Sequence, residues 1–521
     1  MDVQESAPKP AWRQVLLLCL PALLVGVWLR ASFILIAPEA YFGTDSSSYF
    51  WTSERLYTEG KLTMPERRRW LYPLFMVAMR PLPGTIAQST AVVQHGVGLL
   101  LVVGVGWITA HATRHWKLWV PVVTTLAAVW PRMLWYEHEV LAESFFVAAF
   151  VWAVAFFFPR RIPLSERQLF LVLLMAGTVA ALKPHGRLVW AALLAVAALH
   201  AWPPWKWSRR ILATAGVTVA LILSSGEKDQ GAWLLLSSAL PLVNPEGETH
   251  REYRDLLRPL IEEARSVTPW KYGYIQRVYK GDLKAKSPEK RPGPAWRKLR
   301  DSKDFAKNAT ALSREAILAH PWAFLQITLG KVLVTLSDNG DKYIVPTDNA
   351  SDRTLAPDLF WDLQDETALG FYGRKPSGIS LYFSADEAGY RQMVAERRTH
   401  NDWISAPLLA FNQSFRWAIR HGDARDPGVW SELSWLGVLA VCGGFVTLLR
   451  PWRPLFWFLV LPCGFYLFSV FAVGDAVSRY LLPVEWAGYL LAAVCLDAIL
   501  TGTRSLWARL TRRGDRATAS A

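Results

Sequence analysis

Acidic side chains stand at two points where an apolar segment meets a polar one. Asp45 follows the first apolar run by a few residues, and Glu54 lies nine residues after it. Glu139 and Glu143 lie four residues apart in PRMLWYEHEVLAES, so they would share one face of a helix that had begun by then. A carboxylate at a membrane surface can act as a general base where a lipid headgroup meets a water-borne partner. The alternative interpretation is that these acids are solvated loop residues.

Basic side chains gather at two further boundaries of this kind. The turn ALKPHGRLVW holds Lys183, His185 and Arg187 within five residues, and VGDAVSRYLLPVEW places Arg479 and Tyr480 before the last apolar run. Converging donors of this type suit a phosphate group. For Arg479, snorkelling or an ion pair with a nearby acid is an equally good interpretation.

Two other segments carry polar groups of weaker meaning. The stretch RRRWLYPLFMVAMRPL, which includes Arg69 and Tyr72, combines a basic cluster with an apolar face and suits a helix lying in the membrane interface. The hairpin sequence Glu137-His138-Glu139 offers metal-binding atoms but no recognised ligand spacing, so we predict no obligatory metal. No phosphate-binding loop or dinucleotide fingerprint occurs in a suitable setting.

The elements that must position these residues are membrane helices. The chain has 521 residues, of which 52% are hydrophobic and 19% charged, and its apolar residues are grouped in runs of about 20. This indicates an all-α polytopic membrane protein with about ten transmembrane helices, and excludes soluble, fibrous and disordered classes. The predicted spans are 15–37, 87–110, 118–136, 140–158, 169–183, 187–201, 211–225, 430–449, 455–473 and 480–500.

The distribution of charge predicts how these spans are oriented. Six short segments between the spans and at both ends hold 17 of the 57 Lys and Arg residues but four of the 43 acids. Because basic residues near span ends accumulate on the cytoplasmic side, both termini are expected in the cytoplasm, with the first run kept as an anchor. The remaining chain carries 40 bases and 39 acids, so the net charge of +14 reflects topology and a nucleic-acid partner is excluded.

The sequence also predicts three regions. Residues 1–225 form a transmembrane module with a first outer loop at 38–86, residues 226–429 form a mixed extracytoplasmic block, and residues 430–521 form the last helices and a basic cytoplasmic tail. The segment 321–336 carries Lys331 and is short for a span, so we predict an interfacial or re-entrant helix near 314–336. An eleven-span arrangement, in which this segment crosses, is the alternative.

Carboxylates and bases that reach one membrane face are what a sugar transfer from a lipid phosphate requires. One carboxylate would deprotonate the acceptor hydroxyl, while the basic groups would stabilise charge on the departing phosphate. A single displacement with inversion needs one base and no nucleophilic side chain of the enzyme.

The chain resembles the GT-C superfamily of integral-membrane glycosyltransferases, in the bacterial branch near the protein O-mannosyltransferases and the lipid A aminoarabinose transferases. The matching pieces are spread over nearly the whole chain and keep their order. They are WLR at 28–30, DSSSY at 45–49, Gly60, RRWLYPLF at 68–75, Pro131, LAES at 141–144, LKPHGRL at 182–188, REAILAHPWAFLQITLGKVL at 314–333 and SRYLLPV at 478–484.

This resemblance implies a polyprenyl-phosphate-linked sugar as donor, no obligatory cofactor, and transfer outside the inner (cytoplasmic) membrane to a lipid, polysaccharide or protein acceptor. It implies Asp45 as the base, Glu143 as a second acid, and Lys183 and Arg479 as donor-phosphate contacts. The turn has Lys-Pro where relatives often carry Arg-Pro, so the phosphate contact stays open between Lys183, His185 and Arg187. Further expected substrate contacts are Tyr49, Glu54, Arg69, Tyr72, Glu139 and Tyr480.

Two functions of other classes remain as alternatives. A transporter or flippase of lipid-linked sugars would place charges at the bilayer midplane and use discontinuous helices, whereas the charges here gather at the outer rim. A non-catalytic scaffold of an envelope-glycan assembly would need only the large outer block.

Overall fold

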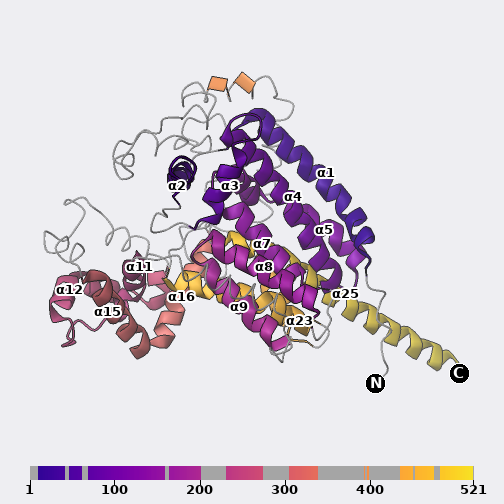
Figure 1. Cartoon of the computed structure of the whole chain (residues 1–521). Coiled ribbons are helices and arrows are strands. Elements are labelled where there is room, and N and C mark those ends of the chain that lie inside the picture. Colours follow the sequence, from indigo (N-terminus) through magenta and orange to yellow (C-terminus); the bar gives the residue numbers. More distant parts are fainter. Residues whose placement is uncertain are drawn as a thin grey trace.

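The structure is a computed structural model, and the regular elements that it describes are helices without a strand among them (Figure 1). This agrees with the all-α class predicted from the sequence. The described residues are 10–40, 46–61, 69–158, 164–200, 230–273, 304–337, 392–393, 396–397, 435–449, 452–473 and 481–519.

The helices fall into three groups along the chain. The first group is α1 (Trp12–Ile36), α2 (Ser46–Glu59), α3 (Leu71–Met79), α4 (Ile86–Ala112), α5 (Trp116–Ala128), α6 (Pro131–Glu137), α7 (Glu143–Ala155), α8 (Glu166–Leu182) and α9 (Gly186–His200). The second is α11 (Gln230–Ala239), η2 (Leu240–Leu242), α12 (Arg251–Arg265), α15 (Phe305–Ala319) and α16 (Pro321–Ser337). The third is α22 (Trp435–Val446), α23 (Arg453–Leu455), η5 (Phe456–Val460), α24 (Leu461–Val473) and α25 (Leu482–Ala519).

Several of these helices are suited to cross a membrane. Four described segments are long and apolar enough to do so, and they coincide with the predicted first, second, ninth and tenth spans; they are Trp12–Ile36, Ile86–Ala112, Arg453–Ala472 and Leu482–Ser505. Shorter apolar helices occupy Glu143–Ala155, Gly186–Leu199 and Gly437–Val446. The predicted span 211–225 lies outside the described residues, and the total of about ten spans stays a prediction.

The predicted third span, 118–136, is two helices and not one. Helix α5 ends at Ala128, and α6 begins at Pro131. Proline lacks a backbone N–H and fits the first turn of a helix better than its interior, so it starts α6 and cannot continue α5. The last helix differs in the other direction, because α25 continues to Ala519, well past the predicted end at residue 500.

The membrane helices share one large apolar core. In Figure 1, α1, α4 and α5 lie side by side, and α7, α8 and α9 continue the bundle toward α24 and α25. Large apolar side chains also face outward on several helices, including Leu17 at 69%, Leu100 at 57% and Phe445 at 68% exposure. Outward apolar residues on long apolar helices fit contact with lipid chains, so we describe the protein as a multi-pass membrane protein.

The second group forms a smaller helical unit with its own core. Helix α12 buries Leu257, Leu260, Ile261 and Ala264 at helical spacing against α11, η2 and α15. The buried Lys331 of α16 donates a hydrogen bond to Ser238 Oγ at 2.8 Å, which gives this charged residue a polar partner inside the unit. The part of block 226–429 that the structure describes is therefore helical.

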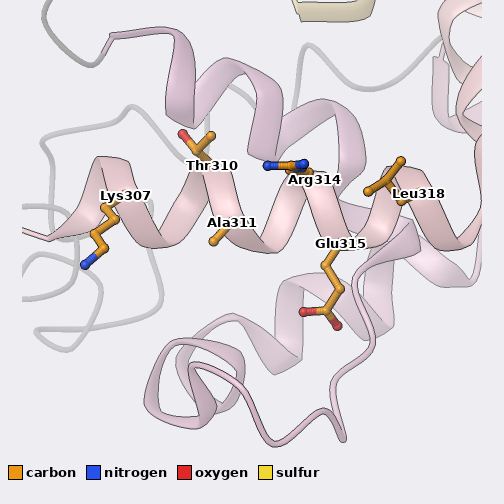
Figure 2. Close-up of a pocket in the computed structure, with 6 residues that line it drawn as sticks. All are labelled: Lys307, Thr310, Ala311, Arg314, Glu315 and Leu318. Carbon is orange, nitrogen blue, oxygen red and sulfur yellow. The ribbon is translucent and has the colours of Figure 1, made fainter.

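A groove of about 440 Å³ runs along the exposed face of α15 in this unit (Figure 2). Its lining residues are Lys307, Thr310, Ala311, Arg314, Glu315 and Leu318. The Glu315 carboxylate also accepts from Arg254 Nη2 at 2.7 Å, which ties α15 to α12. The groove is thus built on a helix whose other face belongs to the core of the unit.

The start of α1 and the middle of α25, around Asp497, lie at the same end of the bundle. The rings of Trp12 and Trp107 are 4.9 Å apart, so α1 begins beside the end of α4. The buried Asp497 of α25 accepts from the backbone N–H groups of Arg114 and His115 at 2.8 and 3.1 Å, in the turn that follows α4. That both termini lie on the cytoplasmic side stays a prediction.

Candidate functional site

The predicted site residues that the structure describes lie toward the opposite end of the bundle. At this end, named the site end below, α1 and α8 finish while α4, α7, α9 and α25 begin, and α2 and α3 lie over it (Figure 1). The segment between α6 and α7, residues 138–142, is named the 138–142 link below. Buried polar side chains from several of these elements contact one another here.

Glu143 and Lys183 form a buried ion pair at this end. Glu143 is the first residue of α7, Lys183 directly follows α8, and their side chains are only 3% and 10% exposed. The ammonium of Lys183 donates to Glu143 Oε1. The sequence predicted both residues for the site but assigned them separate roles, and the ion pair between them was not predicted.

The turn from α8 to α9 brings Lys183 to this position. Pro184 cannot continue α8, and Gly186 begins α9 so close to α8 that an added Cβ atom would lie 2.1 Å from the carbonyl oxygen of Val179. Only glycine allows this approach of the two backbones. The tight turn therefore fixes Lys183 beside α7.

Two of the predicted substrate contacts, Tyr49 and Tyr72, lie against each other in this region. Their ring centroids are 4.8 Å apart in an edge-to-face arrangement, and both residues are buried. The Tyr72 hydroxyl donates to Gln94 Oε1 at 2.7 Å. Burial raises the pKa of Tyr72 well above 10, and the charges of Tyr49, Glu143 and Glu139 act in the same direction, so Tyr72 stays a neutral donor.

Gln94 connects this tyrosine to the 138–142 link. Its amide nitrogen donates to the backbone carbonyls of Glu137 and Glu139 at 2.9 and 2.7 Å. The Glu139 carboxylate is buried and accepts from Trp135 Nε1 at 3.1 Å. Because α7 begins only at Glu143, the shared helical face considered for Glu139 and Glu143 does not form; both instead lie near Tyr72.

The other predicted residues in the described part occupy the surroundings. The His185 ring lies 5.3 Å from that of Phe146 and 5.7 Å from that of Tyr466, and both His185 and Arg187 are partly exposed. Arg69 is buried just before α3. Glu54 of α2 forms an ion pair with Arg80, and its predicted contact with the substrate stays a prediction.

Asp45, Arg479 and Tyr480 lie outside the described residues, and their predicted roles stay predictions. Their neighbours in the sequence belong to the site end. Ser46 begins α2 directly after Asp45 and is buried. On the other side, Glu485 in the first turn of α25 accepts from Arg132 Nη1 of α6 at 3.0 Å.

A second group of buried polar side chains was not predicted as a unit. Arg30 of α1 donates to Glu137 Oε1 at 2.7 Å, and Glu137 Oε2 lies 2.9 Å from Nδ1 of His95 in α4. The Nε2 atom of His95 lies 3.0 Å from Nδ1 of His138. We name these four residues the buried network. Its sequence signal is the presence of Arg30 and His95 inside long apolar runs, where charged groups are rare.

Two neighbouring residues, Gly98 and Phe33, shape the space around the buried network. An added Cβ atom at Gly98 would lie 1.8 Å from Glu137 Oε1, so glycine leaves room for the carboxylate. The Phe33 ring packs on His138 at 4.4 Å between centroids. Burial lowers the pKa of His138 well below 6.5, the charge of His95 lowers it further, and hydrogen bonds with the backbone of Glu39 and Ala37 oppose this.

Comparison with known proteins gave one structural likeness. No protein-family profile matches the chain, and no curated protein matches it. Among solved structures, the chain is similar to ArnT from Cupriavidus metallidurans, whose structure contains bound undecaprenyl phosphate, at 15% sequence identity over 95% of this chain and 79% of that one. The TM-score is 0.30.

Proposed function

We propose that the protein is a GT-C-type glycosyltransferase that moves a sugar from a polyprenyl-phosphate carrier to an envelope acceptor on the outer face of the inner membrane. One observation carries this proposal: buried acidic, basic and phenolic groups from α2, α3, α7 and the end of α8 meet at one end of a bundle of apolar helices. A charged headgroup attached to a lipid chain stays at the membrane surface, so an enzyme has to bind it at such an end.

The reaction is a single displacement. Asp45 takes the proton of the acceptor hydroxyl, and the acceptor oxygen forms a bond to the anomeric carbon on the face opposite the phosphate. The bond between the anomeric carbon and the phosphate oxygen breaks, and its electron pair leaves with the polyprenyl phosphate. Lys183 and Arg479 stabilise the charge that develops on this leaving group.

The described contacts suggest how the remaining groups contribute. Glu143 holds the Lys183 ammonium at the start of α7 before the carrier binds. Tyr72 stays protonated beside Glu139 and Glu143, so it can donate to a sugar or acceptor oxygen when Gln94 releases its hydroxyl. The Tyr49 ring packs edge-to-face against Tyr72 and so holds its ring in this position.

Exchange of Asp45 for Asn is the direct test of this proposal. Envelope glycans from cells with and without the protein first identify the sugar and acceptor; purified protein in proteoliposomes is then given a panel of labelled polyprenyl-phosphate sugars. We expect Asp45→Asn to abolish transfer with normal membrane insertion. Glu59→Gln, at the exposed C-terminal end of α2 in the same predicted outer loop, is the matched control and should retain transfer.

The outcomes separate the competing functions. Transfer retained by Asp45→Asn would remove Asp45 as the base. If the unmodified protein transfers no sugar from any donor of the panel, the transporter or scaffold interpretation is favoured, and movement of the lipid-linked sugar between leaflets distinguishes these two.

A further inference from the structure

The buried network starts on α1 and ends at residues just beyond it. From Arg30 it runs through Glu137 of α6 and His95 of α4 to His138, whose ring interacts with the backbone of Ala37 and Glu39 beyond the end of α1. Arg30 also donates to the carbonyl oxygen of Ala128 at 3.0 Å, at the end of α5. One set of contacts therefore fastens α4, α5 and the 138–142 link onto α1.

All four side chains of this network are at most 3% exposed, so they make almost no contact with solvent. Burying charged groups carries a large desolvation cost, and apolar residues of the same volume often pack as stably. Stability alone therefore gives little reason to keep an arginine and a glutamate here. A defined orientation of the joined elements is the better explanation.

The network is adjacent to the proposed site. His138 is followed directly by Glu139, and Glu143 begins α7 four residues later. Residues 37–40 are held a second time, because Ala40 N–H donates to the Ala87 carbonyl at 3.1 Å and Glu39 accepts from Thr85 Oγ1 at 3.1 Å. The same segment leads, five residues further along the chain, to Asp45.

We propose that Arg30, Glu137, His95 and His138 are positioning residues, which lock the 138–142 link onto the end of α1 and so set Glu139 and Glu143 relative to residues 37–40, the start of the first outer loop. This inference rests on the proposed glycosyl transfer for its catalytic consequence. None of the four residues needs to touch the substrate. Their effect is exerted through Glu139, Glu143 and the start of the first loop.

Two variants of Glu137 test this role. Glu137→Gln keeps the size of the side chain but removes its charge, and Glu137→Asp keeps the charge but is one methylene too short to reach both Arg30 and His95. We expect kcat per folded molecule to fall by about tenfold to a hundredfold in both, because small misplacements of reacting groups have effects of this order. The donor KM should change less than kcat, since the side chains of Lys183 and Arg479 themselves are unaltered.

Asp497→Asn is the matched control at the other end of the bundle. Asp497 is a fully buried carboxylate that accepts hydrogen bonds from the turn after α4, so its loss also weakens a buried polar contact. We expect this variant to unfold at a lower temperature while its kcat per folded molecule stays unchanged. A fall in kcat equal to that of the Glu137 variants would mean that the network acts through stability alone and would overturn the proposal.

Hydrogen exchange of backbone amides gives a readout that does not depend on transfer. In Glu137→Gln we expect faster exchange at residues 37–40 and 139–142 and unchanged exchange at 113–115, next to Asp497. Unchanged exchange in both former segments refutes the lock, whatever the activity. Faster exchange with unaltered kcat refutes the positioning role. If the unmodified protein transfers no sugar, the proposed function fails, and the exchange pattern alone decides whether the network fastens the two segments.

Discussion

Replacing Glu143 and replacing Lys183 should change the affinity for the polyprenyl-phosphate carrier in opposite directions. Lys183 donates to Glu143, and the two side chains are only 10% and 3% exposed. A polyprenyl phosphate that contacts Lys183 has to share this cation with the carboxylate, whose negative charge also repels the phosphate. We therefore expect Glu143→Gln to bind the carrier more tightly and Lys183→Met to bind it more weakly.

The size of the shift follows from the strength of one charged contact. A hydrogen bond to a charged group contributes about 1.5–3 kcal/mol, and about 1.4 kcal/mol corresponds to a tenfold change in Kd. The Kd for the carrier should thus change by roughly tenfold to a hundredfold in each direction. Each single variant should also lose about 3–5 kcal/mol of unfolding free energy, because the remaining buried charge has lost its ion-pair partner. The double variant, which has neither charge, should regain part of that loss.

Binding of a polyprenyl phosphate to the protein in lipid nanodiscs, followed by tryptophan fluorescence, measures the shift. The uncharged polyprenol of the same length is the control, because it keeps the lipid chain and lacks the phosphate; its affinity should be the same in both variants. Thermal unfolding of the same samples reports stability. If the two variants weaken phosphate binding in parallel, or leave it unchanged while stability falls, the ion pair is structural and Lys183 is not a phosphate contact.

Three further changes have definite expected results. Gly98→Ala brings a methyl group onto the Glu137 carboxylate and should cost about 1–3 kcal/mol of stability, whereas Gly96→Ala, with open space around it, should be neutral or stabilising by up to about 1 kcal/mol; thermal unfolding compares the two. Tyr72 has a raised pKa in the folded protein, so its contribution to stability is complete below pH 10 and is lost as pH rises above it; Tyr72→Phe should make unfolding less sensitive to pH above 10. Asp497→Ala removes the acceptor of several hydrogen bonds and should lower the unfolding free energy by about 3 kcal/mol, again measured by thermal unfolding.

The long helices could be predicted because hydrophobicity alone defines them. Helices α1, α4 and α25 begin within a few residues of the predicted runs, since a stretch of about 20 apolar residues has few other stable states in a membrane. The break between α5 and α6 was missed because the run stays apolar across it. The sequence signal of this break is Pro131, which begins α6.

The site could be predicted by residue type but not by pairing. Glu143 and Lys183 could be predicted because each stands where an apolar run meets a polar segment. That they contact each other depends on the register of α7 against α8 and on the close approach at Gly186, which no local pattern encodes. Arg30 and Glu137 are separated by 107 residues, so their contact likewise follows only from packing of the helices.

The placement of each charge on its own helix supports the proposed exchange of Lys183 between Glu143 and a phosphate. Lys183 lies at the C-terminal end of α8 and Glu143 at the N-terminal end of α7. Helix dipoles favour a cation at the first of these positions and an anion at the second by about 0.3–1 kcal/mol each. Each charge is therefore stabilised by its own helix as well as by its partner. When a phosphate draws Lys183 away, Glu143 keeps the favourable end of α7, and the exchange of partners costs less than breaking an isolated buried pair. This low cost is what the proposed role requires, because a carrier must bind, react and leave.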